Sequence, residues 1–395
     1  MDGEQIEGVD EMNFELPEEL RLLKDNVRRF VDRELIPIER EVCTDNKIKP
    51  QMRESLEGKA KALGLWLYDV PQVYGGQGLG LLAKVVVWSE LGRTIALPTR
   101  NASIFGPNVS PILYYLDAEQ KERYLLPVIR GEKKACFAQT EADAGGDPGS
   151  MRTTAVRDGG DYVINGTKRF ITGADEADFA QVFAVTDPEK GSRGGISGFL
   201  VDMDTPGIKL LRAQEMVMDD RPWEIALEDV RVPISNLIGE EGEGFKFAQN
   251  WISAGRIRHG ARGMGVIERC LELGVGYAKQ RITFGKPLAE RQAVQWMLVD
   301  MHTELHQLTL MVHHAAWKAD RGEDIRYDAY MCKYFGDTKS YEAADRCMQI
   351  HGGIGLTMDL PIERMWRDQR SFVITEGPTE ILKMALARHV LRKYE

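Results

Sequence analysis

The spacing of apolar residues changes twice along the chain, and this change restricts the fold more than any other feature. From about residue 135 to about residue 238, apolar and polar residues alternate with a period of two, whereas on both sides they recur every three or four positions. A period of two predicts β-strands, and a period near 3.6 predicts amphipathic helices. At 395 residues the chain also exceeds the usual size of one domain. We therefore expect an α+β fold in three parts: an all-α domain at 1–134, a β domain at 135–240 and a four-helix bundle at 241–395.

Turn residues divide the middle region into short strands that have no helices between them. Asp158-Gly159-Gly160, Asn165-Gly166 and Pro206-Gly207 mark turns. Asn165-Gly166 stands between two strand-like runs and predicts a β-hairpin. Regularly spaced strands of this kind predict an antiparallel sandwich or barrel. The expected strands are 135–140, 153–157, 161–165, 168–172, 179–186, 198–202, 208–211 and 225–232.

The two flanking regions carry the helical spacing. A glycine-rich run at 75–80 lacks the preceding strand of a dinucleotide-binding motif, so we interpret it as a surface loop. The first bundle helix contains glycines at 255, 260, 263 and 265, and each costs roughly 0.5–1 kcal/mol relative to alanine. Close packing or a nearby ligand would explain them. The main expected helices are 17–42, one that ends near residue 64, 81–92, 245–280, 288–321, 325–350 and 378–393.

Composition argues against several classes of protein. The net charge of −10 disfavours a nucleic-acid partner, and no apolar run approaches the roughly 18 residues that cross a bilayer. The five cysteines are scattered without a C-x-x-C pair, so neither a disulfide framework nor a metal site is expected. The stretch 1–15 is acidic and lacks the pattern of a secretory or transit peptide. The simplest expectation is a cytoplasmic protein.

One carboxylate near the C-terminus is a candidate for catalysis. The segment 349–380 opens with a cluster of glycines, continues with a charged run and reaches the apolar residues 372–374, which we expect to be buried. Glu376 follows, with Gly377 and Pro378 behind it at the start of the next helix. A carboxylate at a helix entrance beside an apolar wall is a candidate general base. An ordinary role at the helix terminus has the same local pattern.

Five separate stretches together point to a known family. They are Q-T-E-A-D-A-G-G-D at 139–147, K-R-F-I-T-G at 168–173, Q-R-I-T-F-G-K at 280–286 with Gln292 after it, Q-I-H-G-G-I-G at 349–355, and the segment from Arg367 to Glu376-Gly377. In order and spacing they resemble the motifs of the acyl-CoA dehydrogenase family. The resemblance extends along nearly the whole chain.

The resemblance implies FAD as the cofactor, held without a Rossmann fold. Thr140 and Thr172 would hydrogen-bond the flavin ring, and Phe170 would stack beside it where the family more often has Trp. Gly146 stands where the family usually has Ser. The cofactor-binding residues carried over from the family are Phe137, Thr140, Gly146, Phe170, Thr172, Arg281, Phe284, Gln292, Gln349, Gly353 and Thr379.

The resemblance also implies which residues act on the substrate. Glu376 matches the family's base for the α-proton, while the rival base position falls on Gly255, which has no side chain. Thr375 stands where straight-chain enzymes usually carry Tyr, which favours a branched, cyclic or bulky acyl group. Pro378 departs from the usual Glu-Gly-Thr and removes one backbone N–H. The implied substrate contacts are Ser253, Arg256, Thr375 and Gly377.

The implied reaction is the α,β-dehydrogenation of an acyl-CoA thioester to the trans-2-enoyl-CoA, with electrons passed to an electron-transfer flavoprotein. Other chemistry on the same scaffold stays open: an acyl-CoA oxidase, an enoyl-CoA reductase or a desulfinase-type lyase. A non-catalytic FAD-binding paralogue also stays open. Arg281 and Phe284 match residues that contact the FAD of a neighbouring subunit, so we expect a homo-oligomer, with a dimer of dimers the commonest form in the family.

Arg281→Ala should weaken FAD binding and subunit association together, because its side chain is expected to serve the neighbour's cofactor. Losing a hydrogen bond to a charged phosphate typically costs about 1.5–3 kcal/mol, which is roughly a tenfold or greater loss of affinity. The measurement is FAD content per chain together with the oligomer mass by sedimentation. A variant that keeps full FAD occupancy as a monomer would contradict the expectation.

Overall fold

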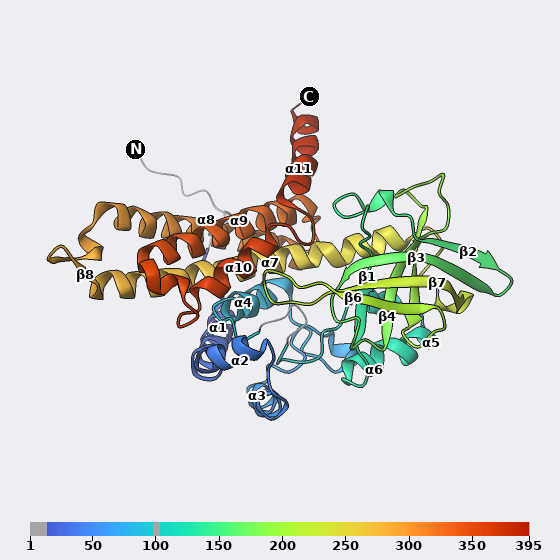
Figure 1. The fold of residues 1–395 in the computed structure, drawn as a ribbon, viewed down its shortest axis with the longest axis horizontal. Helices are drawn as coiled ribbons and strands as arrows, with labels where there is room; N and C mark the ends of the chain where they lie inside the picture. Colours follow the sequence, from blue (N-terminus) through green and yellow to red (C-terminus); the bar gives the residue numbers. More distant parts are fainter. Residues whose placement is uncertain (1–13, 98–102, 395) are drawn as a thin grey trace, which may run out of the picture.

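The computed structural model describes residues 14–97 and 103–394. Residues 1–13, which carry most of the acidic N-terminal stretch, lie outside the described residues. Figure 1 shows short N-terminal helices on one side, a curled sheet at one end, and long helices that run across the rest of the molecule. The expected three-part α+β architecture is confirmed.

The N-terminal part is helical and packs around its own apolar core. The helix expected at 17–42 is interrupted at a 3-10 turn, Ile36–Ile38, because Pro37 has no N–H to donate. The glycine-rich run forms a loop before α4, as expected, and Gly75 takes the left-handed conformation there. The helices are α1 (Glu18–Phe30), α2 (Glu39–Asp45), α3 (Pro50–Ala62), α4 (Leu81–Leu91), α5 (Ala118–Gln120) and α6 (Leu126–Ile129).

The middle part is one curled seven-stranded sheet. The strand order is β1-β4-β2-β3-β7-β6, and β5 pairs with β4. Most pairings are antiparallel as expected, whereas β1 and the start of β2 run parallel to β4. The strands are β1 (Ala135–Ala138), β2 (Thr154–Asp158), β3 (Asp161–Ile171), β4 (Phe179–Val185), β5 (Ile196–Asp202), β6 (Ile208–Ala213) and β7 (Trp223–Pro233).

The hairpin predicted at Asn165-Gly166 is wrong. Both expected strands around it belong to β3, and these two residues form a bulge where the register against β7 shifts. The Asn165 side chain donates to the Asp229 carboxylate at 3.1 Å and accepts the Asp229 backbone N–H at 2.8 Å, which holds the bulge in place. The tight hairpin lies instead between β2 and β3, at Gly159-Gly160.

The C-terminal part contains the four long helices expected from the sequence and one more. That additional helix, α10, covers the charged run, and the spacing analysis does not predict it. The C-terminal helix α11 projects from the body of the molecule (Figure 1). No helix in the described part of the chain is long and apolar enough to cross a membrane. The elements are α7 (Gly244–Gln280), β8 (Ile282–Thr283), β9 (Lys286–Pro287), α8 (Gln292–Asp320), α9 (Arg326–His351), α10 (Ile362–Phe372) and α11 (Thr379–Lys393).

Glycines let α7 pack with its backbone against two neighbouring helices. A Cβ added to Gly263 would lie 2.9 Å from the carbonyl oxygen of Gly336 in α9. A Cβ added to Gly336 would lie 2.9 Å from the Cα of Gly260. A Cβ on Gly265 would overlap the carbonyl oxygen of Ser89 in α4. Gly260, Gly263 and Gly265 are therefore explained by close packing, which was one of the two explanations expected from the sequence.

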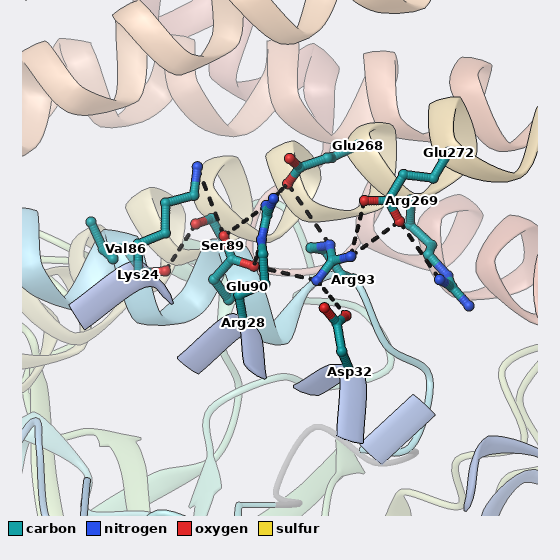
Figure 2. A network of polar contacts seen from close by, with 10 residues as sticks. All are labelled: Lys24, Arg28, Asp32, Val86, Ser89, Glu90, Arg93, Glu268, Arg269 and Glu272. Carbon is teal, nitrogen blue, oxygen red and sulfur yellow. Dashed lines mark hydrogen bonds and ion pairs between the residues drawn. The ribbon is translucent and has the colours of Figure 1, made fainter. Parts of the chain in front are cut away.

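A network of charges holds the N-terminal helices against α7 (Figure 2). The fully buried carboxylate of Glu90 in α4 accepts from Arg28 Nε at 2.9 Å, and Arg28 also bonds Glu268 of α7 at 2.6 Å. Arg93 donates to the Glu272 carboxylate at 2.9 and 3.1 Å. Because each buried charge has a partner, the desolvation cost of bringing them together is offset, and the contact becomes specific to one arrangement.

Gly263→Ala should lower the thermal unfolding midpoint, because its new methyl group would press on the backbone of α9. Overpacking of this kind typically costs about 1–3 kcal/mol. Gly276→Ala in the same helix is the matched control, since a Cβ there meets nothing within 4 Å. It should leave the midpoint unchanged or raise it, because alanine is favoured over glycine in helices by about 0.5–1 kcal/mol. Equal midpoints for the two variants would contradict the close packing of α7 on α9.

Candidate active site

Glu376 lies in the tight connection between α10 and α11. Its backbone is left-handed, with φ of 55°, and Gly377 follows at φ of 102°. A residue with a side chain adopts this conformation only where its surroundings hold it there. The Thr379 N–H closes the turn by donating to the Val373 carbonyl oxygen at 3.2 Å. The side chain of Glu376 is 13% exposed, so its carboxylate is largely removed from water.

The apolar wall expected before Glu376 is only partly present. Phe372 is buried, but Ile374 is 54% exposed, so its predicted burial is wrong. The reason is that α10 ends at Phe372 and the chain then turns outward, a change of direction that an apolar run does not reveal.

Gly255 of α7 provides the space for the Glu376 carboxylate. A Cβ built on Gly255 would overlap Oε2 of Glu376. A side chain at position 255 and the observed position of Glu376 therefore exclude one another. The glycine that the sequence analysis rejected as a base is the residue that allows Glu376 to lie here.

Behind Glu376 lies a buried group of charged residues that sequence reasoning missed. His259 Nε2 is 3.4 Å from Glu376 Oε2, and His259 Nδ1 is 3.0 Å from the carboxylate of Asp337 in α9. Lys333, one turn earlier in α9, donates to Asp337 at 2.8 Å and to the carbonyl oxygen of Phe372 at 3.0 Å. One signal was present in the sequence: His259 is four residues after Gly255 and so shares its helix face.

Arg256 is a buried cation beside the same turn. It is 6% exposed, its guanidinium lies 4.7 Å from the centre of the Tyr330 ring, and Nη2 would be 3.2 Å from a Cβ on Gly377. Burial lowers the pKa of Arg256, and Tyr330 and Glu376 partly oppose that change. Its Nε and Nη1 have no hydrogen-bond partner among the described residues. Buried donors of this kind normally have an acceptor, so a bound ligand is the natural source of one.

Two buried hydroxyl groups near the same turn also lack a hydrogen-bond partner among the described residues. They are Thr375 Oγ1 and Thr379 Oγ1. A Cβ on Gly146 would lie 3.2 Å from Ile381 and 3.8 Å from the Pro378 ring, so the first motif of the β domain meets the start of α11 here. Two of the departures from the family pattern, Gly146 and Pro378, are therefore neighbours. The polar atoms left without partners between these elements fit a polar cofactor or substrate.

The residues expected to face the flavin lie where β1 and β3 end. The Arg169 N–H donates to the Thr140 carbonyl oxygen at 2.8 Å, which brings the segment of Thr140 beside that of Phe170 and Thr172. Phe170 is 46% exposed and has a left-handed backbone, with φ of 59°. An exposed aromatic ring held in this conformation is available for stacking on a ligand. Phe137, in contrast, packs against Phe183 at a ring distance of 5.1 Å, within the β domain.

A buried ion pair joins the first two motifs. Lys168 Nζ donates to Glu141 at 2.8 Å, and the same carboxylate accepts the backbone N–H groups of Arg152 at 2.7 Å and Thr153 at 3.0 Å. Burial lowers the pKa of Lys168 to about 8, against the attraction of Glu141. This pair fixes the loop between β1 and β2, which carries Gly146, and the sequence analysis did not predict it.

The structure does not bring all predicted site residues together. Arg281 follows His259 on α7 by a helical distance of roughly 33 Å, and Gln349 follows Asp337 on α9 by roughly 18 Å. Figure 1 shows the β8 hairpin, with Phe284 at its tip, at the opposite end of the molecule from the sheet. Gln292 and Gly353 are exposed and lie near these ends. None of these five residues contacts the Glu376 turn within the described part of this chain.

Two further predictions concern Ser253 and metals. Ser253 is in α7, but its side chain lies outside the described residues. Within the described part of the chain, no three His, Cys, Asp or Glu residues are arranged to hold a metal ion, and the five cysteines are free thiols.

Comparisons with known proteins agree along the whole chain. Sequence models of the acyl-CoA dehydrogenase N-terminal, middle and C-terminal domains match residues 17–132, 136–230 and 242–391. An acryloyl-CoA reductase (NADH) of Anaerotignum propionicum is 36% identical over 98% of both chains. The mitochondrial short-chain specific acyl-CoA dehydrogenase of Homo sapiens is 35% identical over 97% of this chain and 92% of its own. The solved butyryl-CoA dehydrogenase of Megasphaera elsdenii superimposes with a TM-score of 0.84 at 29% identity, over 96% of this chain and 100% of that one.

Gly255→Ala should displace the Glu376 carboxylate, because the new methyl group would take the space of Oε2. If Glu376 acts in the reaction, the rate should fall at least about tenfold, as expected when a reacting group is shifted by roughly 1 Å. The measurement is the rate of flavin reduction after rapid mixing with an acyl-CoA substrate, with FAD content and thermal midpoint recorded as controls. Gly276→Ala is again the matched control, and its flavin should be reduced at the wild-type rate. An unaltered rate in Gly255→Ala would show that Glu376 is not constrained in this way.

Proposed function

The chain belongs to the acyl-CoA dehydrogenase family, and from this premise we propose that it oxidises an acyl-CoA thioester to the trans-2-enoyl-CoA, with Glu376 as the base for the α-proton. The observation that carries the proposal is the position of Glu376. Its carboxylate is largely buried, is held in a left-handed turn over Gly255, and lies next to donors that have no acceptor among the described residues. A base for a weakly acidic C–H group needs such a fixed and poorly hydrated environment.

FAD is the cofactor of this family, and it supplies a hydride acceptor for the β-hydrogen of the substrate. On our proposal, Phe170 stacks beside the flavin while Thr140, Thr172 and Thr379 hydrogen-bond it. The half-exposed Phe170 ring and the buried Thr379 hydroxyl support these roles. Gly146 leaves room between the β domain and the start of α11.

The remaining residues orient the thioester and keep water away. On our proposal, the backbone N–H of Glu376 donates to the thioester carbonyl oxygen and stabilises the enolate charge as the α-proton leaves. Arg256 and the Thr375 hydroxyl supply further donors next to the same position. Thr375 is smaller than the Tyr that straight-chain enzymes carry there, so we propose a branched or otherwise bulky acyl group.

Reduction of an enoyl-CoA is the second candidate, and a specific observation favours it. The relatives include proteins named acryloyl-CoA reductase (NADH) and 3-(aryl)acrylate reductase, at 36% and 38% identity. In that direction Glu376 would deliver a proton to the α-carbon instead of removing it, so the same geometry serves both reactions.

We further propose that the active form is a homo-oligomer and that electrons leave to an electron-transfer flavoprotein. Phe284 is 96% exposed at the tip of the β8 hairpin, and Trp296 and Val299 of α8 are each 60% exposed. Large exposed apolar side chains gathered at one end of a bundle support an interface between subunits.

Glu376→Gln should abolish flavin reduction by acyl-CoA while it leaves substrate binding nearly intact, because the change keeps the shape and removes the proton acceptor. Loss of a general base typically lowers the rate about 10²–10⁴-fold. Rapid-mixing absorbance at the flavin band measures the rate, and Glu380→Gln, an exposed neighbour in α11, is the matched control. Reduction within tenfold of wild type would place the base elsewhere.

The same assay distinguishes the two directions. A panel of straight, branched and aromatic acyl-CoAs is added to the oxidised enzyme without oxygen, and bleaching of the flavin supports dehydrogenation. If no acyl-CoA bleaches the flavin but NADH does, and an enoyl-CoA then restores the absorbance, the protein is a reductase and the dehydrogenase proposal fails.

A further inference from the structure

We propose that His259 is a positioning residue: as an imidazolium that lies between two carboxylates, it favours the ionised form of Glu376 and holds that carboxylate in place. This inference rests on the proposed function, because it assigns His259 a role in preparing Glu376 as the base. Nothing in the sequence motifs points to this residue. The argument depends on the contacts of one imidazole ring.

Both nitrogens of His259 face a carboxylate. Nδ1 lies 3.0 and 3.1 Å from the two oxygens of Asp337, and Nε2 lies 3.4 Å from Oε2 of Glu376. The side chains of His259 and Asp337 are 6% and 1% exposed, so water cannot separate these groups. The ring is also held by the edge of Phe372, at a ring distance of 5.0 Å.

The number of protons on the ring follows from this geometry. A neutral imidazole has one N–H and one lone pair, so either tautomer would direct a lone pair at a buried carboxylate. The doubly protonated ring has an N–H on each side: Nδ1 donates to Asp337, and Nε2 faces Glu376 at 3.4 Å as its ion-pair partner. We therefore assign His259 the imidazolium form while both carboxylates are ionised.

Charges on the neighbouring elements support this arrangement. Lys333 of α9 is fully buried and pairs with Asp337 at 2.8 Å, while Arg256 of α7 lies beside the Glu376 turn. Tyr330 of α9 lies under Arg256, and Arg262 of α7 lies over the Phe372 ring at 4.9 Å. The buried charges alternate in sign from Lys333 through Asp337 and His259 to Glu376. Each buried charge in this row therefore has an opposite charge next to it.

The consequence for the reaction concerns Glu376. When a substrate covers the site, loss of water favours the protonated form of a carboxyl group, which cannot act as a base. The imidazolium opposes that tendency, since an opposite charge at this distance favours the ionised form. As the ion-pair partner of Oε2, it also holds the Glu376 carboxylate against α7. The bond from the α-carbon to hydrogen then breaks as an O–H bond forms on Glu376, while His259 keeps its own proton.

The first experiment needs no turnover. In the FAD-loaded oligomer labelled with ¹⁵N-histidine, the His259 signals are identified by their loss in His259→Gln and followed with pH by NMR. The imidazolium should persist to higher pH in wild type than in Glu376→Gln, with a midpoint shift of about one unit or more. His313, a half-buried histidine of α8 beside Lys24, should titrate identically in both proteins and serves as the internal control. Equal His259 midpoints in the two proteins would overturn the proposal.

The second experiment separates positioning from packing. His259→Gln keeps a donor but has no charge, so the acid limb of the flavin reduction rate should move to higher pH by about one unit or more. Substrate affinity and FAD content should change less than threefold. His313→Gln is the matched control and should leave the pH profile unchanged. An unshifted acid limb in His259→Gln, or a rate that falls only in proportion to lost FAD, would show a purely structural role.

Asp337→Asn adds an independent variant that keeps the ring. It should lower the pH up to which the imidazolium persists. The companion change Lys333→Met removes the buried charge that would otherwise lose its partner. If no acyl-CoA reduces the flavin of wild type, the proposed function fails, but the NMR comparison still tests the protonation of His259.

Discussion

The site depends on the point where α7 crosses α9 with almost no side chains between them. Gly260 and Gly263 of α7 meet Gly336 of α9 at backbone distance. This approach carries His259 to within hydrogen-bonding distance of Asp337, because each is the immediate neighbour of a crossing glycine. A larger residue at the crossing would separate the helices and draw the His259 ring away from the buried pair of Lys333 and Asp337. Glycine is unfavourable inside a helix, and here that cost is offset by the contacts which close packing allows.

Buried ion pairs occur at three places in the structure. Glu90 pairs with Arg28 between the N-terminal helices and α7, Lys168 pairs with Glu141 under the first motif, and Lys333 pairs with Asp337 behind the site. Such pairs add little net stability, because desolvation opposes attraction. They make wrong arrangements costly, however, since any displacement leaves a buried charge without its partner. The elements that meet at Glu376 come from distant parts of the sequence, and these pairs favour one relative placement of them.

Features that depend on local spacing could be predicted from the sequence, whereas features that depend on contacts between distant segments could not. The change of period predicted the three-part architecture, because periodicity reports which face of each element is buried. Asn165-Gly166 was misread because the same pair of residues serves a hairpin turn and a bulge, and only the partner strand β7 distinguishes them. The helix α10 was missed although Ile362, Met365 and Phe372 recur at helical spacing, since the stretch was interpreted only as a charged run. His259 shares a helix face with Gly255, but the sequence does not reveal its contact with Asp337, because α9 lies far from it in the sequence.

Gly255 and Glu376 show how two distant positions can compete for one volume. The carboxylate oxygen of Glu376 occupies the space that a side chain on Gly255 would enter. A carboxylate extended from position 255 would therefore approach the same region from the opposite side of the site. His259 is on the same face of α7 as Gly255, one helical turn further on, so its imidazole borders the same volume. The two positions are thus not independent: a side chain at position 255 would displace the Glu376 carboxylate from where it lies in this structure, next to the imidazole.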